Sequence, residues 1–333
     1  MDDTKTAVIT GATSGIGLAT AHEFAAKGYN LVLAARRASE LEHVAKELRE
    51  LEVGVRVEVL DTADEAAMER LGEAARQAFG GIDVWVNNAG VYIAGKFEDT
   101  PLEDTRRMMD TNFFGYVNGS RVALTHFRDQ GYGTLINIAS VNAAAPQPYV
   151  SVYSASKAAV RALDESLRME LVLDGLSSKI HVCTVMPAGI DTNIFRNSAN
   201  YTGKELLAVE PVYSPRLVAR RIVALAHAPK REIFVGGAGR LLALQNRVSP
   251  RLYERLVSLF TRGDALGSTD AADTKGNLYE SIESHRGIVG GWRGRRASGE
   301  TADRIMVAGV ALVGTLAVLA AVILLTNDDD EEE

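Results

Sequence analysis

The sequence has little cysteine and no recognisable leader or metal-binding motif. Cys183 is the only cysteine among 333 residues, so no disulfide can form within the chain, a usage typical of reducing compartments. The six histidines show no metal-ligand spacing, and we predict no metal site. The N-terminus lacks a basic region followed by an apolar one, which argues against a signal peptide.

Excess positive charge is also missing, which argues against a nucleic-acid-binding surface. The formal net charge is −7, of which Asp328–Glu333 contribute −6 and the remaining chain only −1. Proteins that bind nucleic acids instead carry a basic patch or stripe that contacts the phosphates. We therefore expect no nucleic-acid partner.

Apolar residues, by contrast, make up 47% of the chain and recur in short β-rich runs. Helical stretches lie between most of these runs. Near-continuous apolar strands that alternate with helices indicate a parallel sheet covered on both faces. We predict an α/β fold, a doubly wound, Rossmann-like parallel sheet in a single domain. The predicted strands are 7–10, 31–34, 55–59, 84–86, 135–138, 180–185 and 233–235.

A glycine-rich turn follows the first predicted strand and precedes an apolar helical pattern. Its spacing is Gly-x-x-x-Gly-x-Gly over Gly11–Gly17. Glycines allow a backbone to approach a pyrophosphate closely, and the free N–H groups of a helix N-terminus attract the anion. The predicted dinucleotide-binding residues of this turn are Gly11, Thr13, Ser14, Gly15, Ile16 and Gly17.

Tyr153 and Lys157 give the clearest indication of chemistry. They lie four residues apart in a predicted helix over 149–173, so their side chains share one face. A free tyrosine has a pKa near ~10 and is a poor proton carrier at neutral pH. A neighbouring ammonium group favours the phenolate, and we expect it to bring that pKa towards the working range of a general acid/base.

Five sequence elements occur together in the order and at the spacings of one enzyme family. The chain resembles the short-chain dehydrogenase/reductase family over roughly residues 6–235. The resemblance rests on Thr10–Gly17, Asn87–Gly90, Asn112, Ser140, and Tyr153 with Lys157. It implies a doubly wound fold, oxidoreduction between a carbonyl and an alcohol with NAD(P)H, and a homo-oligomeric assembly.

The same resemblance implies the roles of four catalytic residues. Tyr153 matches the residue that exchanges a proton with the substrate oxygen, and Ser140 matches the one that hydrogen-bonds this oxygen as charge develops. Lys157 matches the lysine that lowers the pKa of the tyrosine and also binds the nicotinamide ribose. Asn112 matches the residue that holds a water in the proton relay behind that lysine. Tyr153 and Lys157 thus belong to both the catalytic and the cofactor-binding set.

Two further segments match family positions near the adenosine half of the cofactor. Asp61 matches the acidic residue that recognises the adenine ring, and Thr62 beside it could equally cap a helix. Asn88, Ala89 and Gly90 match the segment that packs beside the adenosine ribose. Asn88 could equally serve to hold the fold together.

A third segment matches the positions that contact the nicotinamide. Pro187, Gly189, Ile190 and Thr192 follow the predicted strand over 180–185. The family often has Pro-Gly at the start of this segment, whereas this chain has Ala188 there and places Gly189 one position later.

The end of the second predicted strand indicates which cofactor is preferred. It reads Ala35-Arg36-Arg37, without the acidic residue that NAD-dependent members usually carry at the position of Ala35. A carboxylate repels a ribose 2′-phosphate, whereas an arginine fork clasps it with charge-assisted hydrogen bonds. We predict that Arg36, with Arg37 as the second candidate, selects NADP(H), and NAD(H) is the alternative cofactor.

The C-terminus carries a long uncharged run that a soluble enzyme does not need. Residues 305–325 are 21 residues without a charge, and as a helix they would measure about 31 Å, close to the hydrocarbon thickness of a bilayer. We predict one transmembrane helix there, in contact with the lipid bilayer. Arginines precede this run and only acids follow it, so the positive-inside rule places the catalytic domain in the cytoplasm.

These features divide the chain into four parts. The predicted parts are a catalytic domain (1–262), a linker rich in Gly, Ser and Arg (263–304), the membrane span (305–325) and an acidic tail (326–333). Within the linker, residues 276–279 and 290–292 could dock on the domain.

A basic amphipathic segment over 245–260 precedes the linker. Arg247, Arg251 and Arg255 recur every four residues, with apolar residues beside them. This segment could lie on anionic lipid. Alternatively, it could pack against the domain or a partner subunit.

Taken together, the sequence predicts a membrane-anchored oxidoreductase that transfers a hydride between NADP(H) and a carbonyl or secondary alcohol. The anchor favours a lipophilic substrate, such as a sterol, retinoid, fatty aldehyde or 3-oxoacyl chain, and hence a role in lipid metabolism. The competing hypothesis is a catalytically silent NAD(P)-binding scaffold or redox sensor at the membrane. The presence of Ser140, Tyr153 and Lys157 favours the enzyme.

Overall fold

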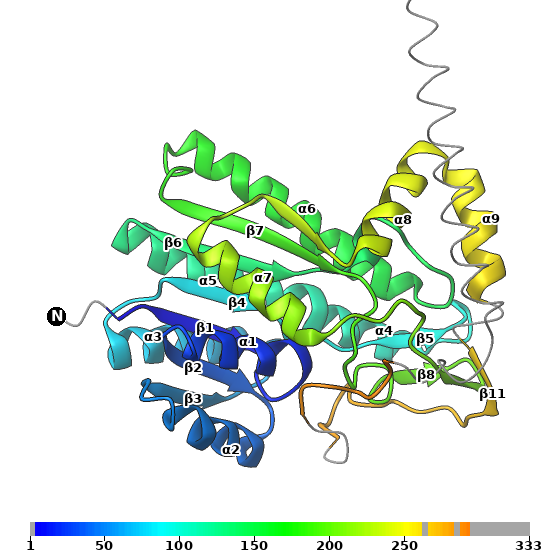
Figure 1. Cartoon of the computed structure of the whole chain (residues 1–333), viewed down its shortest axis with the longest axis horizontal. Helices are drawn as coiled ribbons and strands as arrows, with labels where there is room; N and C mark the ends of the chain where they lie inside the picture. Colours follow the sequence, from blue (N-terminus) through cyan, green and yellow to red (C-terminus); the bar gives the residue numbers. More distant parts are fainter. Residues whose placement is uncertain (1–3, 262–265, 283–286, 294–333) are drawn as a thin grey trace, which may run out of the picture.

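A seven-stranded parallel sheet forms the centre of the computed structural model, which describes residues 4–261, 266–282 and 287–293 (Figure 1). The strand order is β10-β7-β6-β4-β1-β2-β3. The strands are β1 (Thr6–Thr10), β2 (Asn30–Ala35), β3 (Val55–Val59), β4 (Val84–Asn87), β6 (Gly133–Ile138), β7 (Ile180–Pro187) and β10 (Glu232–Val235). The predicted doubly wound sheet is confirmed. The winding reverses between β1 and β4, and in such folds ligands bind at the carboxyl ends of the strands beside this reversal.

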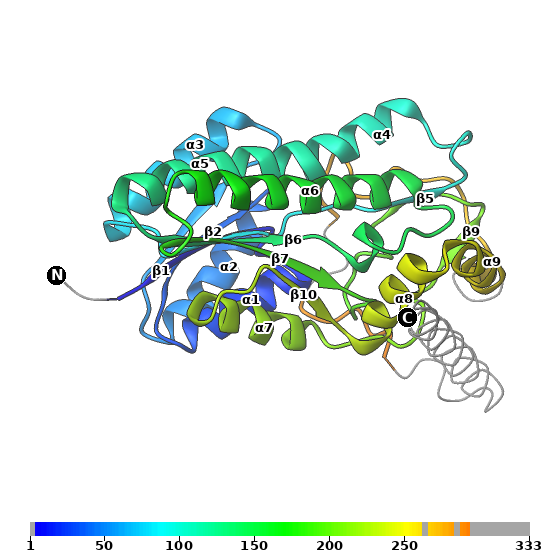
Figure 2. The same cartoon turned by 90° about the horizontal axis from the view of Figure 1, so that it is seen from above.

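Helices cover both faces of the sheet (Figure 2). One layer contains α1 (Gly15–Ala25), α2 (Ala38–Arg49) and α7 (Pro215–His227). The other layer contains α3 (Glu65–Phe79), α5 (Gly115–Gln130) and α6 (Ser151–Leu173). Helix α1 packs against α7, and α3 packs against α5. The sheet is therefore enclosed on both sides, which explains why its central strands are apolar on both faces. The edge strand β3 differs, because Arg56 and Glu58 alternate with its valines.

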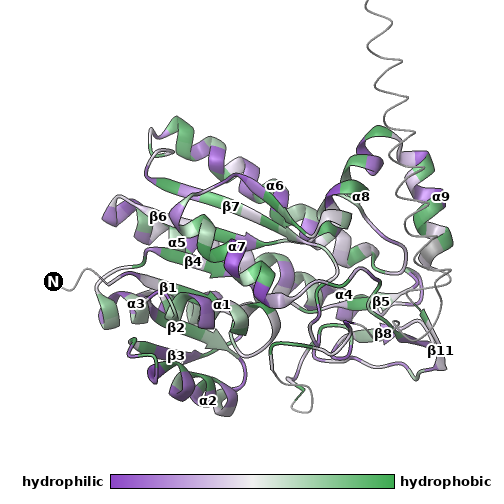
Figure 3. Ribbon diagram, in the orientation of Figure 1, coloured by the Kyte–Doolittle hydropathy of each residue, from purple (hydrophilic) through white to green (hydrophobic). Residues whose placement is uncertain are grey.

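Separate hydrophobic cores lie on the two faces of the sheet, because side chains alternate along each strand. Ile9 of β1 belongs to the core under α1 and α2, together with Leu31 and Leu33. Val8 belongs to the opposite core, together with Trp85. All five side chains are fully buried, and each of the four aliphatic ones contributes about 1.5–3 kcal/mol of burial free energy. The strands accordingly are largely apolar in Figure 3.

Smaller elements extend the fold beyond the carboxyl ends of the strands (Figure 1). A short parallel pair joins β5 to β8, and an antiparallel pair joins β9 to β11. Helix α4 continues into α5 through a short π-helix. These elements are β5 (Ile93–Gly95), α4 (Leu102–Met109), the π-helix (Asp110–Phe114), β8 (Ala199–Tyr201), β9 (Lys204–Leu206), α8 (Gly237–Val248), α9 (Pro250–Phe260) and β11 (Leu266–Asp270).

The basic amphipathic segment falls in α8 and α9. Tyr253 and Val257 are buried on the inner side of α9, where the Tyr253 hydroxyl donates to the Pro146 carbonyl oxygen over 2.8 Å. Arg251 and Arg255 are exposed. One face of the segment thus packs against the domain, and contact of the other face with lipid stays a prediction.

The described part of the chain after α9 packs against the domain. We name residues 266–282 and 287–293 the C-terminal strap, because they contact β9, the glycine-rich turn and the loop after β7. The composition predicts a linker over 263–304, and both predicted docking segments lie within the strap. No helix in the described ranges is long and apolar enough to cross a membrane. The predicted span at 305–325 and the acidic tail lie outside these ranges.

Candidate active site

A cavity of about 840 Å³ lies at the carboxyl ends of the strands, beside the reversal between β1 and β4. Its walls come from the glycine-rich turn, the residues that follow β2, β3, β4, β6 and β7, helix α6 and the C-terminal strap. All predicted site residues line it except Gly17 and Asn112. The fold therefore gathers segments that are far apart in the sequence around one space.

The glycine-rich turn forms one end of the cavity. Gly11 and Gly15 have φ angles of +66° and +55°, which favour glycine. Gly17 lies behind the turn, where a Cβ atom would come within 2.2 Å of the Gly11 carbonyl oxygen. The Asn88 side chain holds the turn by donating to the Thr10 carbonyl oxygen over 2.9 Å. The N-terminus of α1 borders the cavity, as in sites that bind a pyrophosphate.

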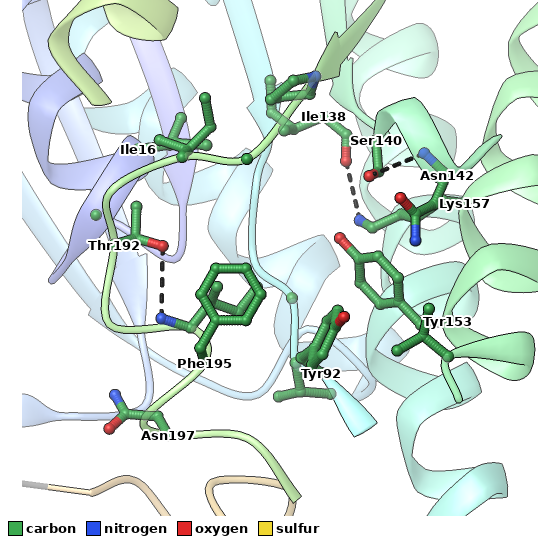
Figure 4. A pocket seen from close by; sticks show the side chains of 18 of the residues that line it. Ile16, Tyr92, Ile138, Ser140, Asn142, Tyr153, Lys157, Thr192, Phe195 and Asn197 are labelled. Carbon is green, nitrogen blue, oxygen red and sulfur yellow. Dashed lines mark hydrogen bonds between the residues drawn. The ribbon is translucent and has the colours of Figure 1, made fainter. Parts of the chain in front are cut away.

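The Tyr153 hydroxyl is directed towards Ser140 and Lys157 (Figure 4). Helix α6 supplies Tyr153, and the turn after β6 supplies Ser140, whose hydroxyl also accepts the Asn142 N–H over 3.2 Å. Burial raises the pKa of Tyr153 to about 12, and a hydrogen bond with Ser140 acts in the opposite direction. The sequence predicts a lowered pKa. The structure corrects that expectation, because burial disfavours the phenolate and is the larger effect.

Lys157 lies beside this tyrosine and is itself buried. Its Nζ donates to the Ile138 carbonyl oxygen over 2.9 Å and to the Tyr116 hydroxyl over 3.2 Å, and it lies 6.0 Å from the centre of the Tyr153 ring. Burial lowers the pKa of Lys157 to about 7. Its charge, and the field that it exerts on the phenol, therefore change near neutral pH.

Tyr116 is a site residue that the sequence analysis missed. Its hydroxyl donates to the Ile138 carbonyl oxygen over 2.9 Å while accepting from Lys157. It is fully buried, and burial raises its pKa well above the usual value. A signal was available, because Tyr116 follows Asn112 by four residues in the sequence.

Asn112 lies in the π-helix, fully buried and away from the cavity wall. Its Oδ1 accepts the Val91 N–H over 2.8 Å, and its Nδ2 donates to the Val91 carbonyl oxygen over 2.9 Å. A Cβ atom built on Gly90 would lie 3.4 Å from Asn112 Oδ1 and 3.8 Å from Lys157 Nζ, so both side chains border this glycine. The amide thus fixes the backbone that follows β4. π-Helical turns are frequent at functional sites.

Arg36 and Arg37 line the cavity beside the glycine-rich turn, and both hydrogen-bond to the C-terminal strap. Arg36 donates to the carbonyl oxygens of residues 277, 278 and 279 over 2.6, 3.1 and 3.2 Å. Arg37 donates to the Ile282 carbonyl oxygen over 3.1 Å and to the Thr13 hydroxyl over 3.2 Å. These guanidinium groups therefore link the glycine-rich turn, the end of β2 and the strap.

Asp61 and Thr62 lie beside the arginines. Asp61 forms a short ion pair with Arg107 of α4, and Arg107 Nε also donates to the Leu278 carbonyl oxygen over 3.0 Å. Arg107 could not be identified from the sequence, because an arginine on a helix surface carries no positional signal. Thr62 does not cap α3. Asp64 is the N-cap residue, and its carboxylate accepts the Ala67 N–H over 3.1 Å.

Pro187, Gly189, Ile190 and Thr192 line the cavity beyond β7. A Cβ atom on Gly189 would approach the Val209 carbonyl oxygen to 3.0 Å. The glycine that stands one position later than in the family pattern therefore allows a close approach between two loops.

The remaining wall of the cavity is mostly apolar and aromatic. Tyr92 packs against Tyr153 with ring centres 4.7 Å apart, and Phe195 packs against Tyr92 at 5.6 Å (Figure 4). Beyond these rings the apolar lining includes Val150, Leu206, Leu207, Val209, Leu241, Leu242 and Val257. Among the residues that the structure describes, no group of His, Cys, Asp and Glu could hold a metal ion.

Comparisons with known proteins agree with this architecture. Residues 5–202 match the sequence model of the short chain dehydrogenase family. An uncharacterized oxidoreductase of Bacillus subtilis, YxnA, is 36% identical over 252 residues, which are 75% of this chain and 70% of that protein. A 3beta-hydroxysteroid dehydrogenase 1 of Eggerthella lenta is 36% identical over 194 residues, which are 57% of this chain and 72% of that protein.

A solved structure shows the same fold with a cofactor bound. The crystal structure of a short-chain dehydrogenase/reductase from Burkholderia phymatum in complex with NAD superposes with a TM-score of 0.70 and 26% identity, covering 82% of this chain and 99% of that chain. The family match covers more than half of the chain and includes the glycine-rich turn, Ser140, Tyr153 and Lys157. The chain therefore belongs to the short-chain dehydrogenase/reductase family, whose members are NAD(P)-dependent oxidoreductases.

Proposed function

We propose that this protein interconverts a carbonyl and a secondary alcohol on a lipophilic substrate, with NADP(H) as the cofactor and Tyr153 as the general acid/base. The observation that carries the proposal is the arrangement of Tyr153, Ser140 and Lys157 in one cavity with the glycine-rich turn. The proton-transfer groups and the predicted cofactor site thus face a common space.

The residues of the cavity fit a dinucleotide. The turn at Gly11–Gly17 is so closely packed that a Cβ atom at position 17 would lie 2.2 Å from the Gly11 carbonyl oxygen, and the N-terminus of α1 opens beside the turn. Asp61 and Arg36 border the proposed adenosine end, and Thr192 borders the proposed nicotinamide end. When bound, the nicotinamide ring supplies or accepts the hydride.

The proposed proton transfer follows from the geometry around Tyr153. During reduction the Tyr153 hydroxyl donates its proton to the substrate oxygen as negative charge develops there, and Ser140 stabilises that oxygen with a hydrogen bond. The raised pKa of about 12 keeps Tyr153 protonated at neutral pH, so the acid is present before the reaction begins. Protonated Lys157 then stabilises the resulting phenolate, and during alcohol oxidation the proton moves in the opposite direction.

The preference for NADP(H) is proposed from the end of β2. Ala35 leaves that position without a carboxylate, and Arg36 and Arg37 both reach the cavity. Their guanidinium groups can donate to a 2′-phosphate alongside their contacts with strap carbonyl groups, because each group carries several N–H donors. Comparable catalytic efficiency with NADPH and NADH would contradict this part of the proposal.

A lipophilic substrate is proposed from the apolar wall of the cavity and the predicted span at 305–325. The hydroxysteroid dehydrogenase among the relatives is consistent with such a substrate. Arg293, the last described residue, precedes residue 305 by 12 residues, which span at most about 40 Å when extended. A span at 305–325 would therefore keep the cavity close to a cytoplasmic membrane surface.

The test is an NADPH-oxidation screen of the purified full-length protein in detergent, with lipophilic ketones and aldehydes beside small water-soluble ones. We expect turnover of the lipophilic set, and a Tyr153→Phe variant that still binds NADPH but loses about 10²–10⁴-fold in rate. Turnover of small carbonyls only, with full activity after deletion of residues 305–333, would contradict the proposed substrate class. Undiminished activity in Tyr153→Phe would contradict the proposed acid.

A further inference from the structure

The C-terminal strap contacts three separate parts of the proposed cofactor site. In its middle, the carbonyl groups of residues 277–279 accept hydrogen bonds from Arg36. Further along, the Gly287 carbonyl oxygen accepts the Gly15 N–H of the glycine-rich turn over 3.0 Å. The strap lies beyond residues 5–202, which match the family model, so the family resemblance gives it no role.

At its end the strap forms a clamp around Asp191 and Thr192. The Asp191 carboxylate is buried and accepts the N–H groups of Gly290 and Trp292 over 3.1 and 2.8 Å. The indole N–H of Trp292 donates to the Thr192 carbonyl oxygen over 2.8 Å. Hydrogen bonds to a carboxylate are stronger than neutral ones. The clamp therefore fixes the backbone of the segment that faces the nicotinamide end of the cavity.

The clamp requires glycine at position 290. A Cβ atom there would lie 2.2 Å from the Thr192 carbonyl oxygen and 2.7 Å from Trp292 Nε1. Gly276, with φ of +51°, makes a similar approach in the middle of the strap, where a Cβ atom would lie 2.3 Å from the Ser198 carbonyl carbon. The strap and the loop after β7 are thus fitted backbone to backbone at two points.

Trp292 also joins an aromatic row that reaches the proposed general acid. Its indole packs edge-on against Phe195 with ring centres 6.0 Å apart, and the Arg196 guanidinium lies 4.9 Å above it. Phe195 packs against Tyr92, and Tyr92 packs against Tyr153 (Figure 4). Trp292 is 5% exposed, so displacing it would open the wall formed by these rings.

We propose that the strap contributes to cofactor binding, and that Trp292 is a positioning residue that acts through Thr192. This inference rests on the proposed assignment of the cavity to a dinucleotide. The strap holds the glycine-rich turn, Arg36 and Thr192 in one arrangement, and a cofactor that contacts all three is bound best by that arrangement. Packing of the strap against the domain and binding of the cofactor then stabilise each other, because such coupling is reciprocal.

Two variants test the proposal in the full-length protein in detergent. Trp292→Phe keeps an aromatic side chain but removes the indole N–H, and Gly290→Ala forces the strap away from Thr192. The rate of NADPH release is measured by stopped-flow displacement, and the Kd by fluorescence titration. Losing a buried hydrogen bond and leaving its carbonyl acceptor unpaired should speed release from Trp292→Phe roughly fivefold or more. Gly290→Ala displaces the strap backbone itself, so it should speed NADPH release more than Trp292→Phe does.

Trp85→Phe is the matched control. It also removes one buried indole hydrogen bond, from Trp85 Nε1 to Asn87 Oδ1 over 2.8 Å, but in the core under α3 and α5. We expect it to lower stability while leaving NADPH release within about twofold. It also leaves Trp292 as the sole tryptophan, so the emission of this variant reports on the strap alone.

Hydrogen exchange provides the reciprocal measurement. Saturating NADPH should slow amide exchange in residues 287–293 of the wild type, and should slow it less in Trp292→Phe. Unchanged NADPH release in folded Trp292→Phe and Gly290→Ala, or strap exchange that does not respond to NADPH, would overturn the inference and show that the strap only packs. A wild-type protein that binds neither NADPH nor NADH would overturn the proposed function itself, and with it this inference.

Discussion

Replacing Asp164 with asparagine should remove a pH dependence from the stability of the protein. Asp164 lies on α6, fully buried, where its carboxyl group accepts from Asn137 Nδ2 over 2.5 Å and from the Thr184 hydroxyl over 2.6 Å. Burial, which is the largest effect, raises the pKa of Asp164 from 3.8 to about 7. At a pH between these two pKa values, Asp164 is protonated in the native state and ionised in the unfolded chain.

The sign and size of the effect follow from this difference. Because the folded-state pKa is the higher one, the stabilising contribution is complete below pH 3.8 and is lost as the pH rises through about 7. The loss amounts to about 1.4 kcal/mol for each pH unit in this window, or about 3 kcal/mol between pH 5 and pH 8. Asparagine has the shape of the neutral acid, accepts from Asn137 and donates to Thr184, but does not titrate. The free energy of unfolding of Asp164→Asn, relative to that of the wild type, should therefore increase by about 3 kcal/mol from pH 5 to pH 8.

Urea denaturation of the full-length protein in detergent, followed by tryptophan fluorescence at pH 5, 6, 7 and 8, measures this difference. Asp174→Asn is the control, because Asp174 is an exposed carboxyl group at the end of the same helix. We expect its effect to stay within about 0.5 kcal/mol at every pH. An Asp164→Asn effect that is equal at pH 5 and pH 8, or that favours the wild type as the pH rises, would refute the reasoning.

Three further predictions concern the cavity and the C-terminus. Arg36→Ala should raise the Kd for NADPH about 10–100-fold, because charge-assisted hydrogen bonds are lost, and should raise the Kd for NADH less. An equal rise in both Kd values in a fluorescence titration would show that Arg36 only holds the strap and does not bind the 2′-phosphate. Tyr116→Phe removes a hydroxyl oxygen that accepts a hydrogen bond from Lys157, so the pKa of Lys157 should fall further. The alkaline limb of the pH–rate profile should then move to lower pH. An unchanged profile would contradict the role given to the Tyr116 hydroxyl. Deleting residues 305–333 should release the protein from carbonate-washed membranes into the supernatant, and retention in the pellet would contradict the proposed anchor.

The sheet was predictable because its strands are buried on both faces and therefore read as apolar runs. Tyr153 and Lys157 could be placed on one helical face from their spacing alone. Their proton affinities could not be predicted in the same way. The shifts to about 12 and about 7 are dominated by burial, which depends on the surrounding elements and not on the four-residue spacing.

Other features left no pattern that sequence analysis could detect. The π-helix around Asn112 spans only five residues and contains no glycine or proline that would mark it in the sequence. Arg107 looks like any exposed helix arginine until α4 is placed beside Asp61. The strap is held largely through its own backbone carbonyl and N–H groups, which every residue carries, so its composition resembled that of a linker.

The order in which the chain is synthesised gives the strap a further consequence. Arg36 pairs with a carbonyl group 241 residues later in the sequence, so this contact cannot form while most of the chain is still being translated. N-terminal parts of a protein generally fold first during synthesis. We expect the nascent sheet to assemble early but to hold a dinucleotide weakly until Trp292 has emerged. Full cofactor affinity would then arise late in translation, shortly before the proposed anchor reaches the membrane.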